Sequence, residues 1–472
     1  MVAAPATAAA APLGISAKPG LYPKFSAGVH DYVSRCHPGR PLKLSIRAPR
    51  GGVSLNGGGP VTGAFKTTLD MRSGQGVRIR TKTATYVIRC LADDFPAWTA
   101  ERHGTPQSKW YIVTPTLGPK GTRYVAFFDR NGVPVWWFRD KRKPQDAKLL
   151  PNGHVVWSFF TNQAYAAFSV PYVERRLDGT VVRRIAAKGV ATDSHDLQVL
   201  PNGNYLLMSY VPRDGVDLSK YGGPQSATVT DAVVQELTPK GKVVFSWNSK
   251  DHIALEEAEP YMKSIISGPV NTTGGPEYDI AHINSVERDG SSLILSMRQT
   301  GLYKISRSTG EIEWKLFGTK TPQSLSIAGE PDGAVVLGGQ HDARILKDGT
   351  LTVHNNRTGT SLLPRAERYR IDESARTATL LEGLTDPKTV ASVCCGSARR
   401  LTGGNWVMAW GFNSIVDELK PSGERAFALT FPTTLFLYRA IPVMPGEVTT
   451  GALRAGMDAM HPVATRPPRI RR

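Results

Sequence analysis

Residues 281–298 read AHINSVERDGSSLILSMR, with His282 near the start and Arg298 at the end. Two runs of strand-forming residues lie on either side of an Asp289-Gly290 turn, which is typical of a β-hairpin. His282 and Arg298 each lie eight positions from Gly290. Because the two arms of a hairpin return beside each other, Arg298 is predicted to lie opposite His282.

Two other segments repeat this frame: SHDLQVLPNG at Ser194–Gly203 and QHDARILKDG at Gln340–Gly349. Each places a histidine, His195 or His341, eight residues before its final glycine, as His282 is placed before its own. If the three segments are equivalent strands of a repeating architecture, the three imidazoles reach the same height and face one cavity.

The turn glycines also set the architecture. The turn glycines are Gly153, Gly203, Gly290, Gly349 and Gly404. Consecutive glycines of this set are about 50 to 60 residues apart, except for Gly203 and Gly290, which are 87 residues apart. A period near 50 residues with four strands per repeat predicts propeller blades. Five anchors and a closing unit predict a six-bladed β-propeller over residues 105–445, which Trp110–Val113 and Leu435–Arg439 would close by pairing. The long step contains an insertion, Asp251–Asp279, which we interpret as a lid over one face.

Short alternating runs separated by Gly-rich turns precede the propeller over residues 21–98 and predict a small β-sandwich. The predicted fold class is therefore all-β, a six-bladed β-propeller preceded by a small β-sandwich. Residues 1–20 are interpreted as a disordered leader or signal remnant, and residues 446–472 as a basic C-terminal tail. Cys36 and Cys90 are compatible with one disulfide and hence with a secreted, cell-surface or periplasmic-type exported protein. Two separate buried thiols are the alternative.

The composition limits the partners of the chain. It has 472 residues, 40% hydrophobic and 21% charged, and no run of 18 apolar residues, so no transmembrane segment is predicted. The net charge of +18 is compatible with anionic partners. The basic residues are spread along the chain without a nucleic-acid-binding motif, so we expect a solvated Arg-rich surface and no nucleic acid partner.

Three imidazoles and a guanidinium would together hold a tetrahedral oxyanion such as a sulfate or phosphate ester, since Arg presents a fork of donors and imidazole supplies donors and a nucleophile. No phosphate-binding loop of the GxxxxGK[ST] type occurs in the sequence.

The motifs HINS at His282–Ser285, SMR at Ser296–Arg298 and QHDAR at Gln340–Arg344, with SHD and LPNG between Ser194 and Gly203, resemble the arylsulfotransferases that work without a nucleotide sulfate donor. The resemblance covers roughly Trp110–Val443. It implies a six-bladed β-propeller, often preceded by a β-sandwich. The N-terminal module, the insertion and Cys394-Cys395 depart from the well-studied bacterial members, so the sequence is similar to a divergent branch.

The resemblance also implies roles for single residues. His341 resembles the histidine that becomes transiently sulfurylated, while His282, Arg298 and His195, with Asn284 as a substrate-binding residue, resemble the groups that hold the sulfuryl oxygens and handle the phenol proton. The implied reaction moves a sulfuryl group from a small aromatic sulfate ester to a phenolic acceptor, with ping-pong kinetics and no cofactor. The natural substrates and the oligomeric state do not follow from the sequence.

Two other function classes remain open. Three histidines can hold zinc in a hydrolase, but the sequence has no HxH or HExxH spacing, and Arg298 would oppose a metal dication. Asp196 and Asp342 follow two of the histidines, but successive strand residues point to opposite faces. A propeller that binds an anion or a polymer without turnover is the other class.

Two smaller features also stay open. Cys394-Cys395 can form a vicinal disulfide or stay as two thiols. Trp157, Phe159 and Tyr210 can stack on an aryl ring or form blade core.

Overall fold

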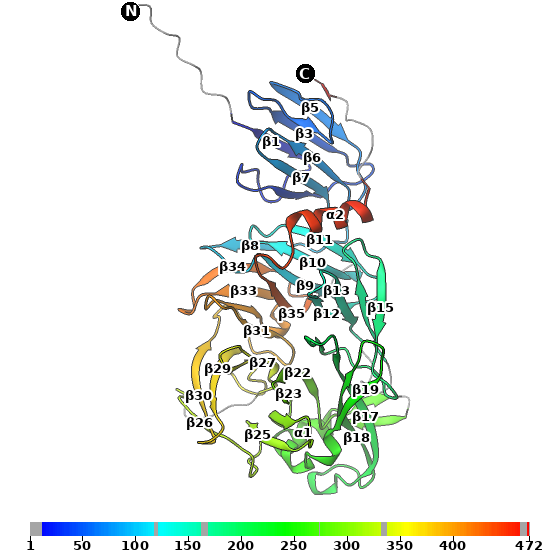
Figure 1. Ribbon diagram of the computed structural model, residues 1–472, viewed down its shortest axis with the longest axis vertical. Coiled ribbons are helices and arrows are strands. Elements are labelled where there is room, and N and C mark those ends of the chain that lie inside the picture. The colour runs from blue at the N-terminus through cyan, green and yellow to red at the C-terminus, as the bar shows by residue number, and fades with distance from the viewer. Residues whose placement is uncertain are drawn as a thin grey trace, which may run out of the picture.

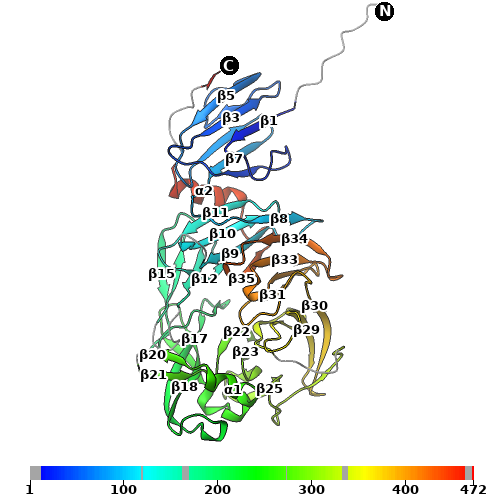
Figure 2. The same cartoon turned by 180° about the vertical axis from the view of Figure 1, so that it is seen from behind.

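The computed structural model describes residues 12–117, 121–161, 169–272, 274–331, 338–462 and 470–471. It is almost entirely β-structure, and its strands form eight sheets in the described residues. Figure 1 shows a small group of strands at one end, followed by a larger ring of sheets, and the view from behind in Figure 2 shows the same division.

The N-terminal part is a β-sandwich of two sheets that share one hydrophobic core. One sheet has the order β1 (Gly14–Lys18), β3 (Leu42–Arg47), β5 (Ala64–Leu69) and β36 (Ile470–Arg471). The other has the order β2 (Asp31–Ser34), β7 (Thr85–Cys90), β6 (Gly76–Arg80) and β4 (Ser54–Leu55). Strand β3 alternates strictly between buried and exposed residues, as expected when one face of a sheet packs on a core and the other meets water.

A disulfide joins Cys36 to Cys90 inside this core, with 5.0 Å between the Cα atoms. The sequence allowed this pairing, and the structure contains it. The expected leader over residues 1–20 is wrong for Gly14–Lys18, because these residues form β1 and pair along β3. Residues 1–11, on which the rest of that prediction falls, lie outside the described residues.

Six further sheets, counted over the described residues, are arranged as a propeller (Figure 1). The first two consist of β35 (Phe436–Val443), β9 (Trp110–Thr116), β10 (Tyr124–Asp129) and β11 (Pro134–Arg139), and of β12 (Pro144–Leu149), β13 (Val155–Phe159), β14 (Tyr172–Arg175) and β15 (Val181–Ile185). The third contains β16 (Leu197–Val199), β17 (Tyr205–Val216), β18 (Ala227–Leu237) and β19 (Val243–Asn248).

The fourth sheet contains β22 (Ile283–Asp289), β23 (Ser292–Met297), β24 (Gly301–Ser306) and β25 (Ile312–Leu316). The fifth contains β27 (His341–Ile345), β28 (Thr350–Asn355), β29 (Arg365–Asp372), β30 (Thr377–Leu384) and β26 (Ser326–Ala328). The sixth contains β31 (Ser397–Arg400), β32 (Trp406–Ala409), β33 (Ile415–Leu419), β34 (Arg425–Thr430) and β8 (Thr99–Arg102).

The five predicted turn glycines occupy equivalent places in this architecture. Each lies in the turn between the first and second strands of a sheet, and each has a positive φ, between 58° and 96°. A glycine adopts this backbone region without the steric penalty that a Cβ atom brings. The repeat on which the prediction rested is therefore confirmed.

The ring is closed by strands from both ends of the chain. Strand β35 pairs antiparallel with β9, so the predicted closure between these two parts of the chain is present. The predicted register is wrong, because Trp110–Val113 lie opposite Ala440–Val443 and not opposite Leu435–Arg439. Strand β8 adds a second closure by pairing with β34, so the ring begins before the predicted boundary at residue 105.

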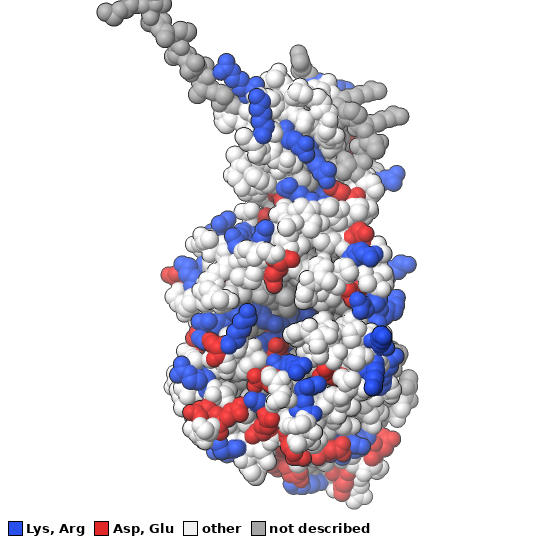
Figure 3. Space-filling view, viewed as in Figure 1, with Lys and Arg blue, Asp and Glu red and all other residues white. Residues whose placement is uncertain are grey.

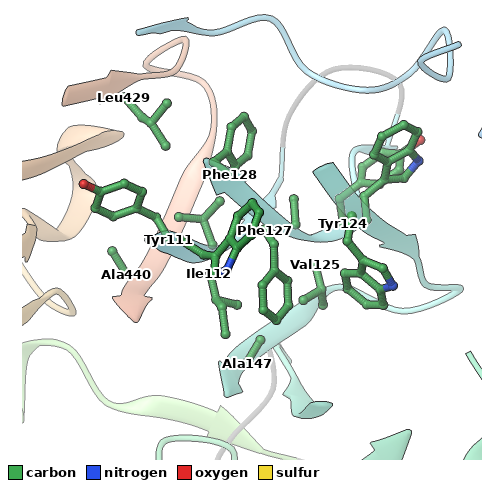
Figure 4. Close-up of a cluster of buried hydrophobic side chains, with 14 of the residues drawn as sticks. Tyr111, Ile112, Tyr124, Val125, Phe127, Phe128, Ala147, Leu429 and Ala440 are labelled. Atoms are coloured by element: carbon green, nitrogen blue, oxygen red, sulfur yellow. The ribbon is translucent and has the colours of Figure 1, made fainter. Parts of the chain in front are cut away.

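The junction between the first and sixth sheets is packed with aromatic side chains (Figure 4). Tyr111 on β9 stacks on Phe427 of β34, with 4.7 Å between the ring centroids. The Tyr111 hydroxyl donates to Glu418 at 2.7 Å, so the polar end of this buried ring is satisfied. These contacts fix the height at which β35 runs along the centre of the ring.

The insertion Asp251–Asp279 is folded rather than extended. It contains short 3-10 turns, helix α1 (Glu259–Ser267), β20 (Val270–Thr272) and β21 (Gly275–Tyr278), and β21 pairs with β18. Glu257 anchors it in the fourth sheet by ion-pairing with the buried Lys315 and accepting a hydrogen bond from Tyr303 at 2.9 Å. Its function as a lid stays a prediction.

The C-terminal segment is more ordered than the predicted basic tail. Helix α2 (Thr450–Met460) lies between the sandwich and the propeller in both views (Figures 1 and 2). Asp458 pairs with Arg89 at 2.6 Å and also with Arg78, and Arg454 pairs with Asp31 at 2.8 Å, so ion pairs bind α2 to the sandwich. Among the described residues, no helix has the length and apolarity required to cross a membrane.

Charges of both signs cover the visible face of the molecule, and the acidic residues are densest at the end formed by β18, β25 and α1 (Figure 3). This distribution agrees with the solvated, Arg-rich surface expected from the sequence.

Candidate active site

The three registered histidines come together at the starts of inner strands of neighbouring sheets. His195 precedes β16, His282 precedes β22, and His341 is the first residue of β27. The ring of His195 lies 5.0 Å from that of His282 and 6.4 Å from that of His341, measured between centroids. All three are buried, with 3% to 7% of their surface exposed. The predicted convergence is therefore present in the structure.

A carboxylate orients two of the imidazoles. Asp193 accepts from Nδ1 of His195 at 2.8 Å, and Asp279, at the end of the insertion, accepts from Nδ1 of His282 at 2.5 Å. A carboxylate that accepts at Nδ1 places the ring proton there and makes Nε2 the basic nitrogen. Burial lowers the pKa of His282, although Asp279 opposes the effect, so this imidazole is neutral at neutral pH.

A backbone carbonyl orients the third imidazole. Nδ1 of His341 lies 2.7 Å from the carbonyl oxygen of Gly396, and because a carbonyl only accepts, Nδ1 carries the proton. Nε2 then holds the lone pair, and the hydroxyl of Tyr438 lies 3.3 Å from it. Burial, with the charge of Arg439 nearby, lowers the pKa of His341 well below its usual value. His341 is therefore a neutral imidazole whose lone pair is on Nε2.

Arg298 lies opposite His282, as predicted from the hairpin. Its backbone N–H donates to the carbonyl of His282 at 2.8 Å, and Nη2 donates to the carbonyl of Val393 at 2.5 Å. Its Nε is buried without a hydrogen-bond partner among the described residues. The guanidinium lowers the pKa of both His282 and Asp279, so its charge acts directly on this cluster. The Nε–H is thus one of the donors that remain for an anionic ligand.

Asn284 is fully buried, and its side chain bonds to the neighbouring inner strand. Nδ2 donates to the carbonyl of Gln340 at 2.8 Å, and Oδ1 accepts from the backbone N–H of Asp342 at 3.4 Å. These bonds hold β22 beside β27, and so His282 beside His341. Its contact with substrate stays a prediction, whereas its role in positioning the two histidines is visible in the structure.

A buried ion network lies directly beside the histidines. Arg439 on β35 pairs with Asp146 at 2.7 Å, with Asp196 at 3.2 Å and with Asp342 at 3.3 Å. Its Nη2 also donates to the backbone carbonyl of Asn284 at 2.7 Å. Asp196 and Asp342, which follow two of the histidines, are thus bound by cations of this network. Asp342 has a φ of 60° beside a register shift in β27, so the simple strand alternation expected from the sequence is interrupted there.

Further cations complete the network. Arg344 pairs with Asp196 at 2.8 Å and with Asp342 at 2.7 Å, and Arg399 pairs with Asp342 at 2.7 Å. These guanidinium groups keep the pKa values of Asp196 and Asp342 low although burial alone would raise them. The network is therefore ionised, and it fixes the inner strands β12, β16, β27, β31 and β35 relative to one another.

The loop 392–396 forms one wall of the site. Cys394 and Cys395 are joined in a vicinal disulfide, so the alternative of two separate thiols does not hold. Asn356 donates to the carbonyl of Cys395 at 2.9 Å, which fixes this loop on the fifth sheet. The same loop supplies the carbonyl that binds Arg298 and the carbonyl that binds His341.

Of the aromatic residues that we considered as ring-stacking candidates, Trp157 and Phe159 form blade core, with 0% and 2% exposed surface. Tyr210 lies at the site: its ring centroid is 5.7 Å from that of His282, and its hydroxyl donates to the carbonyl of Ile283. The described part of the chain contains no group of three or more His, Cys, Asp or Glu residues that could hold a metal ion.

Sequence reasoning missed several residues of the site. Asp193 and Asp279 lie two and three residues before their histidines, and this carboxylate spacing was a usable signal. Tyr438 and Arg439 belong to the closing strand, and the sequence placed this strand in the ring without indicating that its side chains reach the centre. The carbonyl of Gly396 carries no side-chain signal.

The solved structures similar to this chain include a protein of unknown function from Bacteroides caccae, with 13% identity, a TM-score of 0.43, and coverage of 72% of this chain and 99% of that one. They also include the WD40 β-propeller domain of Doa1, with 9% identity, a TM-score of 0.34, and coverage of 73% and 85%. A catalytically inactive virginiamycin B lyase from Staphylococcus aureus, solved with quinupristin, has 10% identity, a TM-score of 0.35, and coverage of 74% and 90%.

No curated protein matches the chain. The arylsulfotransferase (ASST) family matches residues 175–431, which is more than half of the 472-residue chain and includes all three histidines and Arg298. The chain belongs to the arylsulfotransferase family.

Proposed function

We propose that the protein transfers a sulfuryl group from an aryl sulfate ester to a phenolic acceptor through a covalent intermediate on His341. The observation that carries the proposal is the hydrogen bond from Nδ1 of His341 to the carbonyl of Gly396, at 2.7 Å. It leaves the lone pair on Nε2, in a cluster with two other imidazoles and Arg298. A buried, neutral imidazole of fixed tautomer is a competent nucleophile at neutral pH.

In the first step, Nε2 of His341 attacks the sulfur atom. An N–S bond forms, the bond from sulfur to the aryl oxygen breaks, and the phenolate leaves with that electron pair. The ring then carries the sulfuryl group on Nε2 and the proton on Nδ1, so it is cationic, and the carbonyl of Gly396 stabilises that charge. Arg298 stabilises the sulfuryl oxygens as the bond order changes.

In the second step, the acceptor phenol reverses this sequence. Its oxygen attacks the sulfur, the N–S bond breaks, and the electron pair returns to Nε2 of His341. The phenol proton goes to a carboxylate-paired imidazole, His282 or His195, each of which has Nε2 as its basic nitrogen. No cofactor enters either step, and the two half-reactions predict ping-pong kinetics.

The site of this reaction would be outside the reducing cytoplasm. We propose a secreted, cell-surface or periplasmic-type location, because two disulfides in one chain are typical of an oxidising compartment.

The test is acceptor-dependent release of 4-methylumbelliferone from its sulfate ester, with sulfated acceptor measured in the same samples. We expect release to require the acceptor and to equal the sulfated product. His341→Ala should lower kcat/KM by about 10⁶-fold, the size of the loss found when a covalent nucleophile is removed. His103→Ala is the matched control, because this imidazole is 57% exposed and lies far along the chain from the site.

Two other results would replace the proposal. Release without acceptor and without sulfated product would indicate hydrolysis, and stoichiometric zinc in the purified protein would then favour the metal hydrolase. Affinity for aryl sulfates without any release would indicate a propeller that only binds anions.

A further inference from the structure

An apolar surface adjoins the site and has no function in the mechanism above. We call it the aromatic platform and define it by Phe160, Val393, Cys394, Cys395, Phe412 and Phe436. Phe436 is its centre: the ring centroids of Phe412 and Phe160 lie 5.2 and 5.5 Å from that of Phe436. Val393 is 59% exposed and Phe412 is 49% exposed. Large apolar side chains exposed together are uncommon on a soluble protein and mark binding surfaces.

The platform is continuous with the reacting groups at two points. Tyr438, which lies 3.3 Å from Nε2 of His341, has its ring centroid 6.4 Å from that of Phe436. On the other side, Val393 supplies the carbonyl that accepts from Arg298 at 2.5 Å. A ligand whose anionic group meets Arg298 would therefore have its apolar part beside the platform.

The platform is held firmly in place. Ser392 accepts from the backbone N–H of Phe412 at 3.3 Å and donates to the carbonyl of Cys394 at 3.0 Å. Thr358 donates to the carbonyl of Ser392 at 3.0 Å. The vicinal disulfide further restricts the loop. A preorganised apolar surface binds a rigid ring with little loss of conformational entropy.

We infer that the aromatic platform binds the aryl group of donor and acceptor, and that it selects phenols carrying a second fused or linked aromatic ring. This inference rests on the proposed function and specifies its substrate class. The rings of Tyr438, Phe436 and Phe412 step by 6.4 and 5.2 Å between centroids, so the row is longer than a single phenyl ring. It runs from the buried Tyr438 and Phe436, beside the reacting groups, to Phe412 at the surface. Stacked and edge-to-face contacts with such rings stabilise an aromatic ligand beyond the burial of its surface.

The experiment compares 4-phenylphenol with phenol as acceptors at one fixed donor concentration. The specificity ratio is kcat/KM for 4-phenylphenol divided by kcat/KM for phenol. We expect Phe412→Ala to lower this ratio about tenfold, because the second ring loses its aromatic contact while the first ring keeps the contacts near Tyr438. Phe412→Leu retains apolar area without the ring and should give a smaller decrease.

A matched pair of variants controls for the loss of apolar surface. Val393→Ala and Val244→Ala remove the same atoms, and Val244 is similarly exposed, at 47%, but lies on β19 away from the platform. Val393→Ala should lower the specificity ratio and Val244→Ala should leave it unchanged. An equal specificity ratio in the parent, Phe412→Ala and Val393→Ala would overturn the inference. The proposed function would still hold in that case if the protein transferred the sulfuryl group to phenol.

Binding of arylsulfonates separates the two failures, because the carbon–sulfur bond of a sulfonate cannot donate its sulfuryl group. Calorimetry would give the Kd of biphenyl-4-sulfonate relative to that of benzenesulfonate. The protein could transfer no sulfuryl group at all while Phe412→Ala still lowered the preference for biphenyl-4-sulfonate about tenfold. That result would support aryl binding by the platform and contradict the proposed function. If the parent and Phe412→Ala preferred biphenyl-4-sulfonate over benzenesulfonate by the same factor, the inference about the platform would be wrong whatever the outcome for the proposed function.

Discussion

Arg439→Met replaces the central cation of the buried ion network by an apolar side chain of similar length. Arg439 is 2% exposed, contacts Asp146, Asp196 and Asp342, and donates to the carbonyl of Asn284. Breaking a buried ion pair by removing one partner costs about 3–5 kcal/mol, since a charge is left without compensation in a medium of low polarity.

The structure places Arg439→Met at the lower end of this range. Each carboxylate keeps another cation, because Lys148 pairs with Asp146 at 2.8 Å and Arg344 pairs with Asp196 and Asp342. The lost bond to the carbonyl of Asn284 adds about 1–3 kcal/mol, the usual effect of leaving a buried acceptor unsatisfied. We therefore expect a decrease of about 4 kcal/mol in the free energy of unfolding of the propeller.

Denaturant unfolding followed by tryptophan fluorescence measures this change, since the buried Trp136, Trp157, Trp406 and Trp410 all belong to the propeller. Arg139→Met is the matched control: this arginine pairs with Asp94 at 2.6 Å but is 46% exposed, and such a pair contributes about 1 kcal/mol or less. Equal, small effects of Arg439→Met and Arg139→Met would refute the reasoning that the network holds the inner strands together.

The remaining predictions concern single groups. Tyr438→Phe should lower kcat about tenfold with little change in the KM for the donor, since it removes the hydroxyl that donates to the carbonyl of His195 at 2.8 Å and lies 3.3 Å from Nε2 of His341; an unchanged kcat would remove Tyr438 from the site. Burial lowers the pKa of His354 to about 4 in the folded protein, so its imidazole binds a proton more readily in the unfolded chain. The folded state therefore loses stability as the pH falls from about 6.5 to 4. At pH 5 the effect is about 2 kcal/mol, and unfolding curves of His354→Gln should lack it; parallel pH dependences of parent and variant would contradict the assignment. Replacing Cys36 and Cys90 together by Ala should destabilise the sandwich by about 4 kcal/mol, as expected for a loop of 54 residues, and calorimetry showing no change would oppose this.

The propeller could be predicted from the sequence because its signals are local and repeated. Gly290 and the equivalent turn glycines adopt a positive φ, and this requirement is visible in the residue type itself. Helix α2 could not be placed in the same way. Its position depends on ion pairs between Asp458 and Arg89 and between Arg454 and Asp31, residues hundreds of positions apart, and no local pattern reports such a pair.

The candidate site also has a part that the sequence predicted and a part that it did not. The register of His195, His282 and His341 followed from the repeat, and the hairpin placed Arg298 opposite His282. The carbonyl of Gly396 and the hydroxyl of Tyr438 could not be found, since backbone groups have no sequence signal and the closing strand meets the centre only after the ring is formed.

The central claim is tested most directly by the mass of the intact protein, taken during turnover of an aryl sulfate with the acceptor withheld. The account predicts that the parent gains the mass of one SO₃ group as an acid-labile adduct, that added phenol removes it, and that His341→Ala does not acquire it. A parent that transfers sulfuryl groups at full rate without gaining this mass would contradict the covalent role of His341. An adduct that persists in His341→Ala would assign the nucleophile to another residue.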